Sequence, residues 1–298
     1  MISLPRCRVA LAVLLLSAGW LRAAKDDHAN TAVFATVHNG YQRARGPDGQ
    51  YRAETYAFVD GGRVATKSVD RTMEQLPFRR IAELLAEPLA QRRYINTMDA
   101  EKTDLLVIVY YGRTAGTAGS SDSAAHHQLY SEMGNPGAQG SDMLSADGGI
   151  NPGGRHPLEG LLTQIGIEND NRRHANWQNA KLLGYHEELE RTDTIAQYSA
   201  GGTYRNDLIA DVEEDRYFVI LVACDFRLAT REKKLKPLWS TRFNIAARRR
   251  DFEKSLPAMS YFASRYFGRG SDGLLRETVP VGEVEVKDLI HLGEAPKK

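Results

Sequence analysis

The sequence predicts an α+β fold in which a mixed β-sheet carries helices on one face, as a two-layer sandwich. Two segments, 104–111 and 217–226, are apolar on both alternating faces, which is typical of central strands covered on both sides. Two further segments begin with Leu-Pro at Leu76 and Leu256 and carry apolar residues at three- and four-residue spacing. That spacing predicts amphipathic helices packed against the sheet.

The first 24 residues have the composition of a secretory signal peptide. Arg6 and Arg8 precede an apolar run over 9–18, and the small residues Ala23 and Ala24 precede a charged segment. The apolar run is shorter than the about 20 residues that a membrane span needs, so we expect cleavage near residue 24. The expected product is an exported protein, periplasmic or extracellular, with no transmembrane span.

The two cysteines limit the chemistry of the exported chain. Cys7 precedes the apolar run, so it is not placed as the lipidated cysteine of a lipoprotein. Cleavage leaves Cys224 alone, and a single cysteine forms no internal disulfide. The formal net charge of +1 argues against a nucleic-acid partner, since nucleic-acid-binding proteins usually show a marked basic excess.

Residues 25–298 are expected to form a single α+β domain. Its first half reads as a hairpin of strands 32–37 and 51–59 around the turn signal at 46–49. A helix over 76–93 follows, with Pro77 in its first turn and Pro88 kinking it. The strand 104–111 completes the half.

The second half repeats this order of elements. The central strand 217–226, a basic turn over 231–237 and a half-buried strand over 238–245 precede a helix that Asp251 or Ser255 can cap. A β-like run over 281–286 ends it. The repeated order suggests two ββαβ units.

Between the halves, residues 113–160 are rich in Gly, Ser, Ala and Asn and contain few large apolar side chains. Such a segment buries too little surface to offset its ordering entropy, which predicts a mobile low-complexity insertion. Helices are expected over 171–190 and 204–214.

Three groups of residues are candidate chemical sites. Histidines and acids of the insertion are suitable metal ligands, but their spacing matches no zinc motif and favours a solvated loop. Cys224 shares a strand face with apolar residues, which favours a buried inert thiol over a nucleophile. Acid pairs such as Glu213 with Asp215 would suit a glycosidase, but are common on surface helices. We therefore expect no catalytic residue, no metal and no cofactor. The insertion's candidate ligands are His126, His127, His156, Asp122, Asp142 and Asp147.

One stretch has a marked local charge. Residues 226–250 contain nine basic side chains and one acid. Such a surface suits contact with anionic lipid headgroups or an acidic partner, although charge on a hairpin also keeps its edge soluble. The candidate anionic-surface contacts are Arg231, Lys233, Lys234, Lys236, Arg248, Arg249 and Arg250.

The helix ending Leu-Ala-Gln-Arg-Arg-Tyr at 89–94, followed by Thr-Asp-Leu-Leu-Val-Ile-Val at 103–109, resembles small bacterial envelope proteins and lipoproteins of unknown function. The resemblance covers about a third of the chain and implies no catalytic residues. The chain departs from those lipoproteins in lacking an acylated cysteine and in having the insertion.

These observations favour a non-catalytic binding or scaffold protein of the bacterial cell envelope, whose partner is an envelope protein or an anionic surface. The alternative is an exported hydrolase with an unidentified active site. An ordered cleft with converging polar side chains would favour the enzyme, and a sheet with a basic or apolar patch would favour the binder.

Overall fold

The computed structural model describes residues 28–68, 70–117, 127, 157–196 and 202–281. The predicted signal peptide, 1–24, lies outside these residues. So does most of the predicted insertion, although Arg113 belongs to a strand and Pro157 begins a helix. In chain order the elements are β1 His28–Val37, β2 Glu54–Arg63, α1 Arg71–Gln75, α2 Phe78–Ala90, β3 Tyr94–Asn96, η1 Ala100–Lys102, β4 Leu105–Arg113, α4 Pro157–Leu183, α5 His186–Ala196, α6 Gly202–Glu213, β5 Arg216–Asp225, α7 Phe226–Arg231, β6 Pro237–Ala246, α8 Phe252–Ser264 and β7 Leu275–Pro280.

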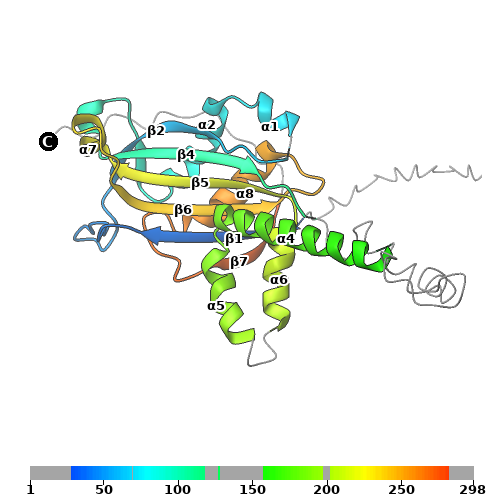
Figure 1. Cartoon of the computed structure of the whole chain (residues 1–298). Helices are drawn as coiled ribbons and strands as arrows, with labels where there is room; N and C mark the ends of the chain where they lie inside the picture. The colour runs from blue at the N-terminus through cyan, green and yellow to red at the C-terminus, as the bar shows by residue number, and fades with distance from the viewer. Residues whose placement is uncertain (1–27, 69, 118–126, 128–156, 197–201, 282–298) are drawn as a thin grey trace, which may run out of the picture.

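Seven strands form one mixed sheet in the order β3-β2-β4-β5-β6-β1-β7 (Figure 1). The β2 strand pairs in parallel with β3 and β4, and the other pairs are antiparallel. The two segments predicted as central strands are β4 and β5, which pair with each other in the middle of the sheet. The α+β class with a mixed sheet is therefore confirmed.

The predicted hairpin of 32–37 and 51–59 is wrong. Gly46 donates to the carbonyl of Gln50 at 2.7 Å, and Arg45 and Tyr51 form one isolated bridge, so the turn closes locally. Beyond it the strands separate, because β1 pairs with β6 and β7 while β2 pairs with β3 and β4.

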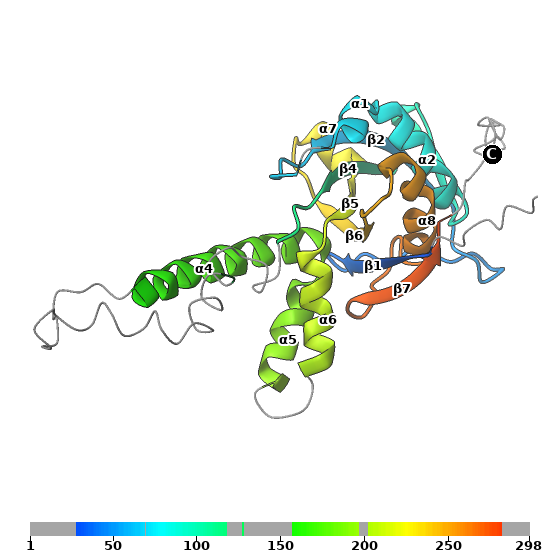
Figure 2. The same ribbon diagram turned by 90° about the vertical axis from the view of Figure 1, so that its right-hand side faces the viewer.

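The two Leu-Pro helices, α2 and α8, pack on the same face of the sheet, as predicted (Figure 2). Pro77 is the N-cap residue of α2, and Asp251 caps α8 by accepting the N–H of Lys254 at 3.3 Å. Each helix connects parallel strands. The chain passes from β2 through α2 to β3 and then to β4, and from β6 through α8 to β7, where β1 lies between β6 and β7. Beyond β7, residues 282–286 of the predicted final strand lie outside the described part.

A second group of helices, α4 to α6, packs on the opposite face, which the two-layer prediction did not include. Its apolar contacts with the sheet are made at one corner, through Ala32 of β1 and through Phe218 and Ile220 of β5. Figure 2 shows this group beside β1 and β6, away from β2. The helix expected over 171–190 is interrupted at Gly184, which has a φ of +87° and lies so close to Phe34 that a Cβ would be 2.6 Å from it.

A buried polar network attaches this helical corner to the sheet. The Arg216 side chain of β5 is fully buried and donates to Asn244 Oδ1 at 2.6 Å and to the carbonyl of Asn30 at 2.7 Å. It forms ion pairs with Asp211 at 3.4 Å and Glu214 at 3.3 Å. Asp211 of α6 also accepts the Tyr185 hydroxyl at 2.9 Å and pairs with Arg276 of β7 at 2.8 Å.

In the connection between β2 and α2, Asp70 is the N-cap residue of α1. Its Oδ1 accepts the N–H groups of Thr72 at 3.0 Å and Met73 at 3.2 Å, and its Oδ2 accepts the Tyr217 hydroxyl at 2.6 Å. Burial opposes the ionisation of Asp70, but the hydrogen bonds, first those of the Thr72 and Tyr217 hydroxyls, lower its pKa to about 2.

Among the described residues, no helix is both long and apolar enough to cross a bilayer.

Candidate functional site

The structure divides the predicted basic surface into two groups. Residues 231–236 lie between α7 and β6, whereas 248–250 follow the opposite end of β6. The ten residues of β6 separate them by about 33 Å at the usual rise of a strand. The prediction grouped these basic residues because they are close in sequence, but β6 places them at its two opposite ends.

The second group is partly occupied by the fold itself. Arg250 donates to the carbonyl oxygen of His28 at 2.9 Å and lies near those of Ala246 and Arg248 at 3.4 and 3.3 Å. Its guanidinium thereby fastens the turn before α8 to the start of β1. Arg248 and Arg249 are exposed.

The first group surrounds an exposed apolar side chain. Lys233 has a φ of +56° in the turn, and Leu235 beside it is 61% exposed. The exposed basic residues here are Arg227, Arg231, Lys233, Lys234 and Lys236, against the acid Glu232, which pairs with Lys234 at 3.3 Å. We call residues 227–236 the basic tip. An apolar side chain ringed by cations suits an anionic, partly apolar surface.

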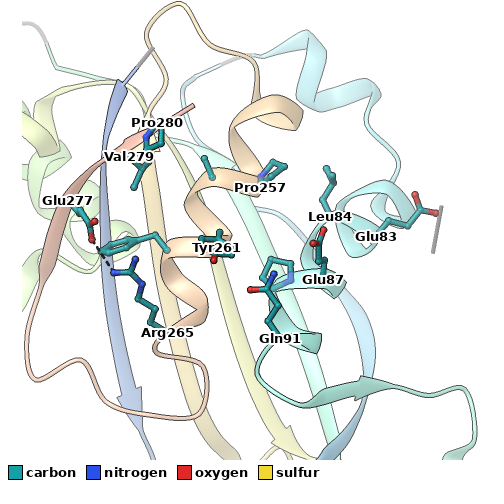
Figure 3. A pocket seen from close by; sticks show the side chains of 13 residues that line it. Glu83, Leu84, Glu87, Gln91, Pro257, Tyr261, Arg265, Glu277, Val279 and Pro280 are labelled. Atoms are coloured by element: carbon teal, nitrogen blue, oxygen red, sulfur yellow. Dashed lines mark hydrogen bonds and ion pairs between the residues drawn. The ribbon is translucent and has the colours of Figure 1, made fainter. Parts of the chain in front are cut away.

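A groove on the α2 and α8 face was missed by the sequence. It has a volume of about 370 Å³ and lies between α2, α8 and the edge strand β7 (Figure 3). Leu84 and Phe262 are each only 4% exposed, whereas Tyr261 is 56% exposed. The lining residues are Glu83, Leu84, Glu87, Pro88, Gln91, Pro257, Ala258, Tyr261, Phe262, Arg265, Glu277, Val279 and Pro280.

Prolines within the helices shape this groove. Pro88 lies inside α2 and Pro257 inside α8, and both line it. A proline has no N–H to donate, so Pro88 removes the helical hydrogen bond that would otherwise occupy the carbonyl oxygen of Leu84. The two prolines also contribute rigid apolar surface to the lining of the groove.

The charges of the groove are mostly paired. Arg265 forms an ion pair with Glu277 at 3.4 Å, and Glu83 pairs with Arg79 at 3.0 Å. Glu87 is exposed, and no hydrogen bond or ion pair joins its carboxylate to another residue in the described part of the chain. The groove therefore presents an apolar surface beside one available negative charge.

The lining of the groove consists mainly of apolar side chains, with a few charged ones. The groove contains no histidine, cysteine, serine or lysine, so it has no paired nucleophile and base of the kind that hydrolases use. Its carboxylates Glu83 and Glu277 are engaged with arginines. Apolar side chains and a basic group of a ligand would complement it.

The other predicted candidates have structural positions or fall outside the described residues. Cys224 is 1% exposed, and burial raises the pKa of its thiol, as expected for an inert cysteine. Glu213 accepts the Asn176 amide at 2.7 Å, while Asp215 binds Arg113. Of the insertion's candidate metal ligands only His127 is described, and the described residues contain no group of three metal-ligating side chains.

Comparisons with known proteins define no family for this chain. No protein family and no curated protein matches the sequence. Among solved structures, a PDZ domain protein from Parabacteroides distasonis aligns with 86% of this chain at 10% identity and a TM-score of 0.34. The aligned chain spans 40% of that protein's length. The molecule is thus defined by its own features, as an α+β protein with a proline-bordered groove between two helices.

Proposed function

We propose that this protein is a non-catalytic binding or scaffold protein of the bacterial cell envelope, whose α2–α8 groove takes an apolar segment of a partner protein. The observation that supports this proposal is the groove itself. Its exposed Tyr261 and buried Leu84 and Phe262 form an apolar lining, and Glu87 offers a carboxylate to a basic residue of the partner. The signal-like residues 1–24 support export, to the periplasm or beyond.

Tyr261 is the side chain through which the groove is best tested. A buried tyrosine removes about 150–250 Å² from water, and the exposed half of Tyr261 therefore offers roughly 100 Å² to a partner. At about 25 cal/mol per Å², its loss should weaken binding by about 2.5 kcal/mol, or roughly 70-fold.

The test is a pull-down from envelope extracts with the protein lacking residues 1–24. Tyr261→Ala and Glu87→Lys should each lose a protein that the unmodified chain retains. Met98→Ala is the matched control, because Met98 is fully exposed and lies outside the groove. Retention of the same proteins by all variants would contradict a role for the groove.

A second contact, with an anionic surface, is favoured by the basic tip. Leu235 is 61% exposed, and four basic residues lie beside it in the chain, Arg231, Lys233, Lys234 and Lys236, of which Lys234 pairs with Glu232. The apolar side chain would insert between headgroups while the cations contact them. We propose that this tip, and not residues 248–250, is the part of the basic segment that contacts such a surface.

The alternative function is an exported hydrolase. It would be favoured by turnover of ester, peptide or glycoside substrates that Glu87→Gln abolishes, since Glu87 is the groove carboxylate left without a partner in the described structure. Turnover unaffected by that substitution would assign the activity to another place or to a contaminant.

A further inference from the structure

On one half of the sheet's second face, the only helix among the described residues is the short α7 at the end of β4 and β5. The helices α2 and α8 cover the first face, and α4 to α6 cover the corner formed by β1, β6 and β5 of the second face (Figures 1 and 2). Beyond that corner, the side chains of β2, β4 and β5 that point away from α2 and α8 are apolar. We call Val59, Leu106, Ile108, Tyr110 and Val222 the open face; Ile220, which packs against the α4–α6 cluster, marks its border.

The strand register makes the open face continuous. Val59, Ile108 and Val222 are directly opposite one another on β2, β4 and β5, and Tyr110 is opposite Ile220. Residues opposite each other in a ladder share a face of the sheet. Val59 is 40% exposed and Tyr110 is half-buried, so apolar surface remains available to a partner.

A charged side chain stands at the border of this face. Arg242 of β6 is opposite Ile220 on one side and Phe34 on the other, in the same row of the ladder. Its Nε is buried and has no hydrogen-bond partner in the described structure. Burial lowers the pKa of Arg242, and the charge of Glu187 on α5 opposes that effect. The fold therefore holds a guanidinium among apolar side chains without a carboxylate bonded to it.

We propose that the open face binds an amphipathic helix of a partner protein, with an aspartate or glutamate of that helix accepting hydrogen bonds from Arg242. A helix is the cover that this sheet uses elsewhere, through α2 and α8 on one face and α4 at the corner of the other. A carboxylate matches the planar donor set of a guanidinium. The surface is separate from the α2–α8 groove, because the sheet lies between them.

A flat face of half-buried side chains favours a protein partner over a small amphiphile. A fatty acid lying on an open sheet would leave one side of its chain in water, whereas a helix brings its own polar face to cover the contact. The helix would also extend the layer that α4 to α6 begin on this side of the sheet.

Site-specific photo-crosslinking in the producing cell tests this inference. A benzophenone side chain at position 222 should give one adduct with a second protein, and the same group at position 278, exposed on β7, should give none. Arg242→Gln should reduce the adduct at least tenfold and Arg242→Lys should reduce it less, because lysine keeps the charge but not the paired donors. Once the partner is identified, the adduct lost in Arg242→Glu should be restored by replacing the partner's acidic residue with arginine.

Stability measurements separate recognition from a structural role of Arg242. Arg242→Met keeps the length of the side chain and removes the buried donor, so its Tm should stay within about 2 °C of the parent's or rise. A fall of more than about 5 °C would assign Arg242 to the fold and overturn the proposal. So would the absence of an adduct, an adduct of two copies of this chain, an adduct with lipid, or an adduct that Arg242→Gln leaves unchanged. A benzophenone at position 261 reports on the groove independently.

Discussion

Removing the carboxylate of Asp211 should destabilise the attachment of α4, α5 and α6 to the sheet more than any substitution on their outer surfaces. Asp211→Ala takes a partner from Arg216, from the Tyr185 hydroxyl and from Arg276 at once. Asp207 lies one turn earlier on the same helix and is exposed, so Asp207→Ala removes a like charge but no hydrogen bond or ion pair of the network; its charge acts on Arg276 only at a distance.

The magnitude follows from the burial of each group. The Tyr185 hydroxyl becomes an unsatisfied buried group, which costs about 1–3 kcal/mol. Arg216 is fully buried and keeps Glu214, so losing one of its two carboxylates costs about 1–3 kcal/mol. The pair with Arg276 is partly exposed and adds less than about 1 kcal/mol. Allowing for relaxation, we expect a loss of about 3–5 kcal/mol, against about 0.5 kcal/mol or less for Asp207→Ala.

Denaturant unfolding at neutral pH, followed by near-ultraviolet circular dichroism, measures both variants. Hydrogen exchange identifies the location, because the amides of α6 should lose protection before those of β4 and β5. Replacing this ion pair by an apolar pair, as Asp211→Leu with Arg216→Met, should recover part of the loss, because the buried charge of Arg216 is removed as well. A change below about 1 kcal/mol for Asp211→Ala would refute the view that this network holds the helices to the sheet.

Three further outcomes follow from single contacts. Gly268→Ala should cost about 2–4 kcal/mol in denaturant unfolding, since Gly268 has a φ of +72° and a Cβ there would overlap the Tyr94 hydroxyl. Asp70 has a pKa below its unfolded value, so its stabilisation, about 1–2 kcal/mol, is present above pH 4 and is lost as the pH falls towards 2; Asp70→Asn should remove that part of the acid-unfolding profile. Changing Lys233 and Lys234 to Glu should weaken co-sedimentation with anionic vesicles by roughly tenfold or more at low salt, with little difference at high salt, while unfolding changes by less than about 1 kcal/mol. Unchanged sedimentation would leave these lysines a solubility role.

The sequence identified the elements whose signal is local. The strand β5 and helix α8 were predicted near their observed bounds, because a run apolar on both faces and an apolar stripe at helical spacing each occur within one segment. The pairing of β1 was not predicted, because its partners Phe243 and Ile245 lie more than 200 residues away and the nearby turn signal at 46–49 favoured a hairpin.

The candidate sites show the same division. Basic residues adjacent in sequence were grouped, but β6 carries Lys236 and Arg248 to opposite ends of the sheet. The groove was missed because Leu84 and Tyr261 come from helices far apart in sequence, although both Leu-Pro helices were placed on one face. Tyr261 is an aromatic residue that lies outside the apolar stripe of its helix, and that position is the sequence signal that would have indicated the groove.

The position of β1 has a consequence for how the molecule acquires its structure. Among the described residues β1 is the first strand, yet it pairs with the last two, β6 and β7, and its partner Pro280 comes 252 residues after His28. The sheet therefore cannot close until nearly the whole described chain has been synthesised, and contacts of such sequence separation slow folding. A peptide of residues 28–37, supplied to a chain that lacks them, should fill the gap between β6 and β7 and restore the native state, as a complementing strand.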